Sequence, residues 1–225
     1  MKILVTGATG GLGGAVTTAF LDAGATVAAV SRSSGTQNTG DSRLLAVPAD
    51  VTMPEGARGV VEKVLNKANH IDALVHLLGG FAGGQPVAET DDATWRRMMD
   101  LNLHSALFMT RAVLPHMLAA QRGRIVAVGS RTGVEPAANL SAYGVSKAAL
   151  IALVRTVAAE VKNSGITANV VLPSVIDTPA NRASNPSADF SKWVKPEAIA
   201  DLLVWLASDA AAQINGAVIP IYGRT

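Results

Sequence analysis

The sequence predicts an α/β fold, a doubly wound parallel sheet of about seven strands with helices on both faces. Two observations indicate this class. Short runs of β-branched and other apolar residues alternate with longer segments of helical periodicity, as in successive βαβ units. The chain also has 225 residues, 49% of them hydrophobic, which is enough to fill one sizeable core. We therefore expect a single domain over residues 1–225.

Each strand is expected at a short apolar run that ends beside glycine, proline or polar residues. In chain order the runs are KILVT (2–6), TVAAV (26–30), LLAVP (44–48), ALVHL (73–77), RIVAVG (124–129), TANVVL (167–172) and AVIPI (217–221). The segments between them have helical periodicity and predict helices at 12–23, 55–68, 92–119, 142–163 and 197–207. The polar segment 180–195 departs from this alternation.

Composition and charge narrow the functional classes. Nineteen basic residues against 17 acidic ones leave a net charge of +2, and aromatic residues make up 4%, so nucleic-acid binding has no support. The absence of cysteine excludes disulfides and thiolate metal sites and fits a reducing compartment. No apolar run approaches the roughly 18 residues of a membrane span, and MKILV lacks the features of a signal peptide. We expect a cytoplasmic protein with no membrane partner.

No metal site is expected. The four histidines, His70, His76, His104 and His116, show no mutual spacing typical of metal ligands, and we interpret them as surface or packing residues.

The first strand is followed by an unusually glycine-rich turn, TGATGGLGG at 6–14, in which five of nine residues are glycine. Its place is the carboxyl end of a strand and the beginning of a helix, where free N–H groups and the helix dipole favour a phosphate. Gly7 would permit the tight turn, Gly11 the close approach of a pyrophosphate and Gly13 the close packing of helix on strand. A loop that only reverses the chain direction is the alternative.

A second group of polar residues lies further along the chain. Tyr143 and Lys147 are four residues apart in SAYGVSKAAL, which places them about 40° apart on one helix face. Ser130 ends the strand RIVAVGS thirteen residues before this tyrosine, and Asn102 lies in MMDLNLHS. Each residue alone has an ordinary structural explanation, such as a surface tyrosine or a serine that caps a loop.

Taken together, Thr6-Gly-x-x-x-Gly-x-Gly, Asn102, Ser130 and Tyr143-x-x-x-Lys147 resemble the short-chain dehydrogenase/reductase family of the compact, ordinary type. The resemblance covers the chain from residue 1 to 225 and implies a Rossmann-like fold. Further landmarks stand in the expected order: Asp50-Val-Thr, Asp72-Ala-Leu-Val, and Pro173 with Thr178.

The resemblance implies an NAD(P)-dependent oxidoreductase that acts on a carbonyl or alcohol. Tyr143 would be the acid, and Lys147 would favour its phenolate by charge and bind the nicotinamide ribose. Ser130 would hydrogen-bond the substrate oxygen, while Asn102 would hold a water that links Lys147 to solvent. By the same resemblance, the residues that would bind the cofactor are Thr6, Gly7, Thr9, Gly11, Leu12, Gly13, Ser31, Arg32, Asp50, Val51, Gly79, Tyr143, Lys147, Pro173, Val175, Ile176 and Thr178.

The end of the second strand predicts which nicotinamide cofactor is preferred. Ser31 stands where an acidic residue would repel a 2′-phosphate, and Arg32 follows with a guanidinium suited to bind one. We predict NADP(H), with NAD(H) as the alternative if Arg32 points into solvent.

Three positions depart from the family pattern. HLLG at 76–79 replaces Asn-Asn-Ala-Gly and affects the adenosine side, and Pro173-Ser174 replaces Pro-Gly at the nicotinamide end. Arg131, directly after Ser130, would either bring positive charge to the substrate mouth or only solvate its loop.

The substrate is expected to be a ketone or a 3-oxoacyl thioester. Its walls would come from 81–86, 132–140 and the substrate loop at 180–195, with Phe81, Val134, Phe190 and Trp193 as candidate apolar lining. The alternatives are a dihydropteridine reductase-like enzyme, suggested by HLLGGFAGG, and a non-catalytic NADP-binding regulator. The resemblance also implies a homodimer or homotetramer assembled through helices 92–119 and 142–163.

Overall fold

The computed structural model describes residues 1–32 and 40–225, and a seven-stranded, all-parallel sheet forms its centre. The strands are β1 (Lys2–Thr6), β2 (Thr26–Ser31), β3 (Leu44–Pro48), β4 (Ala73–His76), β5 (Gly123–Val128), β6 (Ile166–Pro173) and β7 (Val218–Ile221). They lie in the order β3-β2-β1-β4-β5-β6-β7. The direction of winding reverses between β1 and β4, so a ligand crevice is expected above the carboxyl ends of these two strands.

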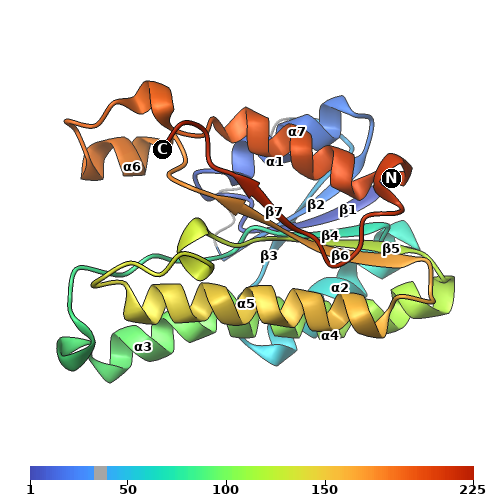
Figure 1. The fold of residues 1–225 in the computed structure, drawn as a ribbon. Coiled ribbons are helices and arrows are strands. Elements are labelled where there is room, and N and C mark those ends of the chain that lie inside the picture. Colours follow the sequence, from blue (N-terminus) through green and yellow to red (C-terminus); the bar gives the residue numbers. More distant parts are fainter. Residues whose placement is uncertain (33–39) are drawn as a thin grey trace.

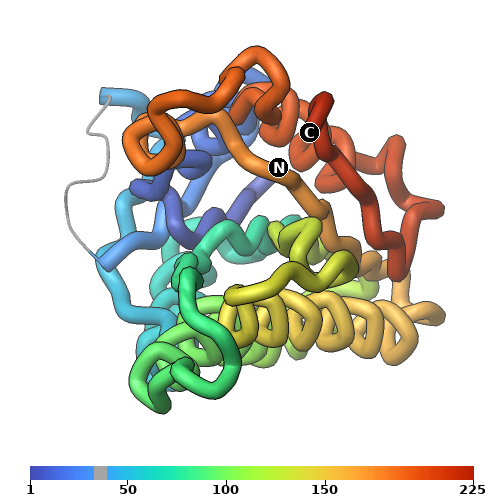
Figure 2. Tube along the Cα trace, turned by 60° about the vertical axis from the view of Figure 1, so that its left-hand side comes forward, coloured from blue at the N-terminus to red at the C-terminus, as the bar shows by residue number. Residues whose placement is uncertain are grey.

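Helices cover both faces of the sheet (Figure 1). They are α1 (Gly13–Asp22), α2 (Pro54–Ala68), α3 (Asp92–Met99), α4 (Ser105–Ala120), α5 (Ser141–Glu160), α6 (Pro179–Ser184) and α7 (Pro196–Ala207). One face carries α2, α4 and α5, and the opposite face carries α1 and α7; Figure 2 shows α4 and α5 running side by side. The predicted α/β class and its doubly wound sheet are confirmed.

Alternation along the central strands explains why the core has two halves. Leu4 pairs in register with Leu74, and both side chains enter the core under α2, α4 and α5. Val5 and Val75, one position further along, enter the core under α1 and α7. Because both faces are covered, the strands are apolar throughout rather than alternately polar, as is typical of parallel sheets.

The predicted helix 92–119 is in fact two helices joined by a π-helical turn, Asp100–His104, which is called the π-turn below. The polar segment 180–195 also contains the short helix α6 and a 3₁₀ turn at Phe190–Lys192.

Within the described residues, α5 is the one helix long and apolar enough to cross a membrane. Its apolar residues Leu150, Val154 and Val157 are buried and pack into the core that lies against the sheet, as expected of a core helix.

Candidate active site

The predicted site residues gather above the carboxyl ends of the strands, on the left of Figure 1. Thr6 ends β1, Ser31 ends β2, His76 ends β4 and Ser130 follows β5. The segment after β6 leads into α6, which lies above this edge.

The glycine-rich turn has little room for side chains. Gly7 has φ +70°, and a Cβ on it would approach the backbone nitrogen of Leu78 to 2.8 Å. A Cβ on Gly13 would collide with the carbonyl of Ala8, so this glycine lets α1 pack on the turn. A Cβ on Gly11 would lie 3.0 Å from the Thr178 methyl group. Gly7 and Gly13 thus admit only bare backbone and Gly11 has little room to spare, which leaves the turn open to a pyrophosphate between α1 and the segment after β6.

A cavity of about 350 Å³ opens beside this turn. Six of the predicted cofactor residues line it: Gly7, Thr9, Ser31, Arg32, Val51 and Gly79. Sequence reasoning missed Gly10, Val30, Ala49, Leu77 and Leu78, which also line it. All five lie at or just beyond strand ends next to predicted residues, so the topology itself is the signal that identifies them.

The mouth of this cavity carries opposite charges. Hydrogen bonds from the Thr52 side chain and backbone lower the pKa of the Asp50 carboxyl, and the charge of Arg32 contributes to the same direction. Arg32 itself is exposed and lines the cavity, so its guanidinium is accessible to a ligand there.

The other predicted cofactor residues have local contacts. Thr6 is fully buried below the turn and hydrogen-bonds His76, while Leu12 packs into the core under α1. The hydroxyl of Thr178 caps α6 by accepting from the Asn181 backbone. Ile176 forms an isolated bridge with Val194. Pro173 ends β6 and Val175 is exposed in the following segment, so the structure brings both to the same edge of the sheet.

Ser130, Tyr143 and Lys147 lie together beyond the carboxyl end of β5. Ser130 is buried after β5, and its side chain lies near enough to Tyr143, in the first turn of α5, to lower the pKa of the phenol. One turn further along α5, the Lys147 ammonium is 6% exposed and donates to the Val128 carbonyl over 3.0 Å. The rings of Tyr143 and Phe81 make an edge-type contact, with their centroids 5.0 Å apart.

Burial controls the protonation of both groups in this structure. Desolvation raises the pKa of Tyr143, and the Ser130 side chain only partly opposes it. Desolvation also lowers the pKa of Lys147 to about 8. The expected lowering of the tyrosine pKa by Lys147 is therefore not seen here. The physical reason is that the ammonium donates to Val128 O rather than pairing with the phenol.

Asn102 lies in the middle of the π-turn and is fully buried. Its amide accepts from Gly80 N over 2.9 Å and donates to Gly80 O over 3.1 Å and to Ser146 Oγ over 3.0 Å. A Cβ on Gly79 would lie 2.7 Å from Asn102 Oδ1 and 3.1 Å from Lys147 Nζ. Asn102 therefore lies against the same glycine backbone as Lys147, while its amide is used to hold the segment after β4.

Residues expected at the substrate side separate into two places. Phe81, Ser141 and Ala142 line a second cavity of about 350 Å³ beside Tyr143, together with Thr94 and Arg97 of α3. Val134 is exposed outside that lining. Within the substrate loop, the rings of Phe190 and Trp193 pack at a tilt with their centroids 4.8 Å apart, and Arg182 lies 4.7 Å over the Phe190 ring.

Arg131 is held by its own loop and by the end of the chain. Its guanidinium pairs with Glu135 at 2.7 Å, donates to Thr225 O and lies 4.9 Å above the Tyr222 ring. These contacts favour the interpretation in which Arg131 stabilises its own loop over the one in which it faces the substrate.

The histidines differ from one another. His70 and His104 lie beside Asp72 and Asp100, and His116 is exposed. His76, by contrast, is 2% exposed and hydrogen-bonded through both ring nitrogens, so it is a packing residue rather than a surface one. In residues 1–32 and 40–225, no group of three or more His, Asp or Glu side chains is arranged to hold a metal ion.

Comparison with known proteins agrees with this arrangement. Residues 1–189 match the family model described as short chain dehydrogenase. The uncharacterized oxidoreductase YvrD of Bacillus subtilis is 32% identical, with 98% of this chain and 94% of that protein covered. The 3-oxoacyl-[acyl-carrier-protein] reductase FabG of Thermotoga maritima is 30% identical, with 98% and 95% covered.

Solved structures agree as well. ElxO with NADP bound superimposes with a TM-score of 0.93 at 25% identity, covering 99% of this chain and 97% of that chain. The 3-ketoacyl-(acyl-carrier-protein) reductase of Brucella melitensis complexed with NADH gives a TM-score of 0.90 at 26% identity, covering 99% and 97%. With the glycine turn and the Ser130–Tyr143–Lys147 cluster already in place, these similarities show that the chain belongs to the short-chain dehydrogenase/reductase family and is an NAD(P)-dependent oxidoreductase.

Proposed function

We propose that the protein is an NADP(H)-dependent reductase that transfers hydride between the nicotinamide and a carbonyl or alcohol substrate. The observation that carries this proposal is that Ser130, Tyr143 and the buried Lys147 lie together at the sheet edge that also holds the glycine turn, with the Ser130 side chain close enough to lower the pKa of the Tyr143 phenol. A proton donor, an oxyanion-stabilising hydroxyl and a cation thus converge next to a dinucleotide cavity.

The chain's own residues supply the proton and orient the substrate. When bound, the cofactor supplies the hydride that reduces the carbonyl carbon. Tyr143 Oη–H then gives its proton to the carbonyl oxygen, whose developing charge accepts a hydrogen bond from Ser130. Below pH about 8, Lys147 carries a positive charge at this edge of the sheet, where its ammonium would bind the nicotinamide ribose. Atoms balance as one hydride and one proton added across the C=O bond.

The proton-transfer role is tested by Tyr143→Phe. Removing the phenol proton is expected to lower kcat by at least about 10²-fold, the size typical of general acid catalysis, while NADPH affinity stays within about threefold. The measurement is NADPH oxidation followed by absorbance, with NADPH binding titrated separately by fluorescence. Full turnover by the variant would contradict the assignment.

We propose NADP(H) as the preferred cofactor because Arg32 lines the cavity and no acidic side chain stands at Ser31. Arg32→Ala is expected to lower the NADPH-to-NADH affinity ratio by about tenfold or more, the loss of a charge-assisted contact with the 2′-phosphate. Arg58→Ala is the matched control, since Arg58 is exposed on α2 and pairs with Glu55. An unchanged ratio in Arg32→Ala, or tighter binding of NADH by the wild type, would contradict the preference.

For the substrate we propose a ketone or a 3-oxoacyl thioester, which the similarity to 3-oxoacyl reductases supports. The test is a panel of ketones, 3-oxoacyl thioesters, quinones and quinonoid dihydropterin, each with NADPH and NADH. Selective turnover of the dihydropterin would favour the dihydropteridine reductase alternative. NADPH binding without turnover of any member would favour a nucleotide-binding regulator.

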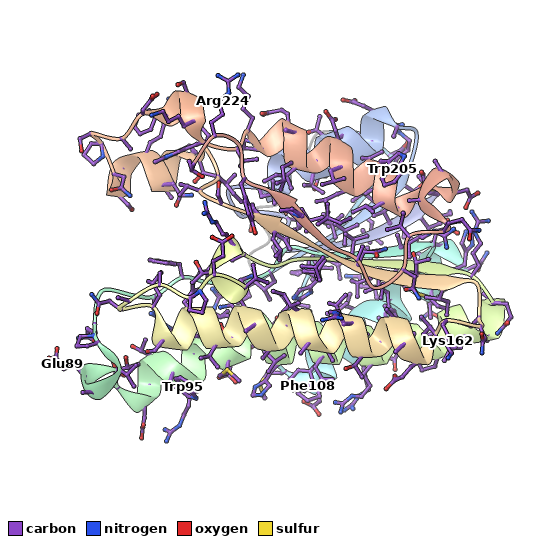
Figure 3. All side chains as sticks on the ribbon, viewed as in Figure 1. Glu89, Trp95, Phe108, Lys162, Trp205 and Arg224 are labelled. Atoms are coloured by element: carbon purple, nitrogen blue, oxygen red, sulfur yellow. The ribbon has the colours of Figure 1, made fainter. Side chains whose placement is uncertain are left out.

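We further propose a cytoplasmic homodimer or homotetramer in which each chain is a single domain with its substrate loop at 180–195. The outer side of the helix layer supports assembly: Trp95 and Val145 are 39% and 46% exposed there, and Figure 3 shows Trp95 and Phe108 pointing away from the sheet. The mass in solution measured by light scattering checks it, and a monomer mass would contradict it.

A further inference from the structure

His76 is a buried polar residue that the proposed proton transfer does not use. It ends β4 at the switch point of the sheet, next to Thr6 of β1, and is 2% exposed. Its Nδ1 lies 2.9 Å from Thr6 Oγ1, and its Nε2 lies 3.1 Å from Ser105 Oγ at the beginning of α4. One imidazole therefore joins the strand that enters the glycine turn to the helix that follows the π-turn.

The neighbouring bonds fix where the protons lie. Ser105 Oγ–H donates to Leu101 O over 2.7 Å, so Ser105 Oγ is free only to accept from His76. His76 Nε2 must then carry the ring proton. Thr6 Oγ1 accepts from Leu78 N over 3.4 Å, which leaves its hydroxyl proton for the bare Nδ1. The neutral Nε2–H tautomer satisfies every bond, whereas an imidazolium would present a second proton to Thr6.

The environment agrees with a neutral ring. Burial lowers the pKa of His76 to about 3, and the nearby positive charge of Lys147 contributes in the same direction. A chain of hydrogen bonds with one donor-to-acceptor direction thus leads from Leu78 N–H through Thr6, His76 and Ser105 to Leu101 O.

The Leu101 carbonyl needs this partner because of the π-turn. Ser105 N donates to Asp100 O, five residues back, so the backbone of Ser105 does not serve Leu101 O as it would in an α-helix. The Ser105 hydroxyl takes over that carbonyl, and His76 holds the hydroxyl in place. Asn102 is the next residue in the π-turn, and its amide contacts Gly80 and Ser146.

From this geometry we propose that His76 is a positioning residue with two separable arms. The Ser105 arm fixes the π-turn and with it Asn102, and the Thr6 arm fixes the backbone of Leu78 against the glycine turn. His76 acts through these neighbours and touches neither substrate nor cofactor. The effect on turnover rests on the proposed function, whereas the hydrogen-bond order and its effect on the two backbone segments do not.

Two substitutions separate the arms, since an Asn side chain reaches where Nδ1 lies and a Gln side chain reaches where Nε2 lies. His76→Asn keeps a partner for Thr6 and loses Ser105, and His76→Gln does the reverse. Ser105→Ala removes the Ser105 arm without changing the ring. His116→Asn, on the exposed side of α4, is the matched control.

The first readout needs no substrate. Nitrogen NMR of the wild type is expected to show a neutral His76 with its proton on Nε2. In hydrogen exchange, His76→Asn and Ser105→Ala should each speed exchange of the backbone amide at position 105 by about five- to tenfold, the size of one lost neutral hydrogen bond, and leave the Leu78 amide unchanged. His76→Gln should do the opposite, and His116→Asn should change neither amide. Combining His76→Asn with Ser105→Ala should add nothing further.

The second readout divides turnover from cofactor binding. Loss of the Ser105 arm is expected to lower kcat by about five- to tenfold at unchanged NADPH affinity, and loss of the Thr6 arm to weaken NADPH binding by a similar factor. A ring proton on Nδ1, equal effects of His76→Asn and His76→Gln at both amides, or additive effects of His76→Asn and Ser105→Ala would overturn the proposal. If the exchange pattern holds but the wild type reduces no carbonyl, the proposed function fails and the assignment of His76 stands.

Discussion

Lys147 carries its charge at a buried position, where that charge is unfavourable for stability. The ammonium is 6% exposed, and the described structure gives it one hydrogen bond, to Val128 O, with no carboxylate beside it. Burying an ammonium without a counter-ion costs free energy, and here the cost appears as a pKa lowered from 10.5 to about 8. A functional site that holds a buried, unpaired charge commonly lowers the stability of the fold.

Lys147→Met is therefore expected to abolish turnover and to stabilise the fold at neutral pH. Because the pKa is lower in the folded state, the unfolded chain binds more protons between pH 8 and 10.5, and wild-type stability rises with pH across that window. The cost in the wild type is greatest below pH 8, so the variant should be more stable by roughly 1–3 kcal/mol at pH 7. This advantage should shrink as pH approaches 10.5.

Urea unfolding at pH 7, 8.5 and 10 measures this difference. Lys162→Met, at an exposed position just past α5, provides the control and should change the free energy of unfolding little at any pH. A variant at position 147 that is less stable than the wild type at pH 7 would show that Lys147 is not held at a cost.

At the scale of elements, the segment after β4 packs closely against the π-turn because it has glycines at the points of contact. Gly79 lies against Asn102 Oδ1 and Lys147 Nζ. The Asn102 amide hydrogen-bonds both the backbone N–H and the backbone carbonyl of Gly80. The π-turn directs Asn102 inward at the point where a regular helix 92–119 was predicted. Helical periodicity in the sequence continues through 92–119, so one extra residue in a turn leaves almost no signal in the pattern.

Gly79→Ala is expected to impair the site more than the fold. A Cβ 2.7 Å from Asn102 Oδ1 and 3.1 Å from Lys147 Nζ requires both side chains to move, so kcat should fall by about tenfold or more and stability by roughly 1–2 kcal/mol. Gly59→Ala is the control, because Gly59 lies inside α2 with nothing within 4 Å of an added Cβ. It should stabilise the protein by roughly 0.5–1 kcal/mol through helix propensity and leave turnover unchanged. Equal kcat values for Gly79→Ala and the wild type would contradict the close fit.

For the molecule as a whole, the sequence predicts well which segments form the sheet and the helix layers. It predicts poorly which side chains from different elements contact one another. Strands such as KILVT and TANVVL are short apolar runs bounded by turn residues, and all seven predicted strands form. Topology then brings Gly7, Ser130 and Tyr143 to one edge, because carboxyl ends of parallel strands share that edge. The spacing of Tyr143 and Lys147 is local and survives folding.

The side-chain contacts that could not be predicted join residues that are far apart in the sequence. His76 and Ser105 are 29 residues apart, and Thr6 and His76 are 70 apart, so no periodicity links them. The effect of the departure HLLG at 76–79 is likewise visible only in three dimensions: Leu77 and Leu78 pack on opposite cores, and both residues line the cavity beside the glycine turn. The direction of the Tyr143 pKa likewise depends on burial, which composition does not give.

The acid stability of the whole fold should depend on His76. Its pKa is about 3 in the folded protein and near 6.5 in an unfolded chain, so as pH falls below 6.5 the unfolded chain binds the proton first. The wild type should therefore lose roughly 3 kcal/mol of unfolding free energy from this group by about pH 4.

The His76→Asn variant lacks this loss. From a wild-type advantage of about 1 kcal/mol at pH 7, which reflects the lost hydrogen bond to Ser105, the free energies of unfolding of wild type and variant should thus converge as pH falls and then cross, with the variant the more stable at pH 4.5. Urea unfolding at pH 7, 6, 5 and 4.5 measures the two curves, with His116→Asn as an exposed control that should run parallel to the wild type. Parallel curves for His76→Asn and the wild type would mean that the imidazole can be protonated without breaking its bonds to Thr6 and Ser105, and the neutral hydrogen-bond chain would then have to be abandoned.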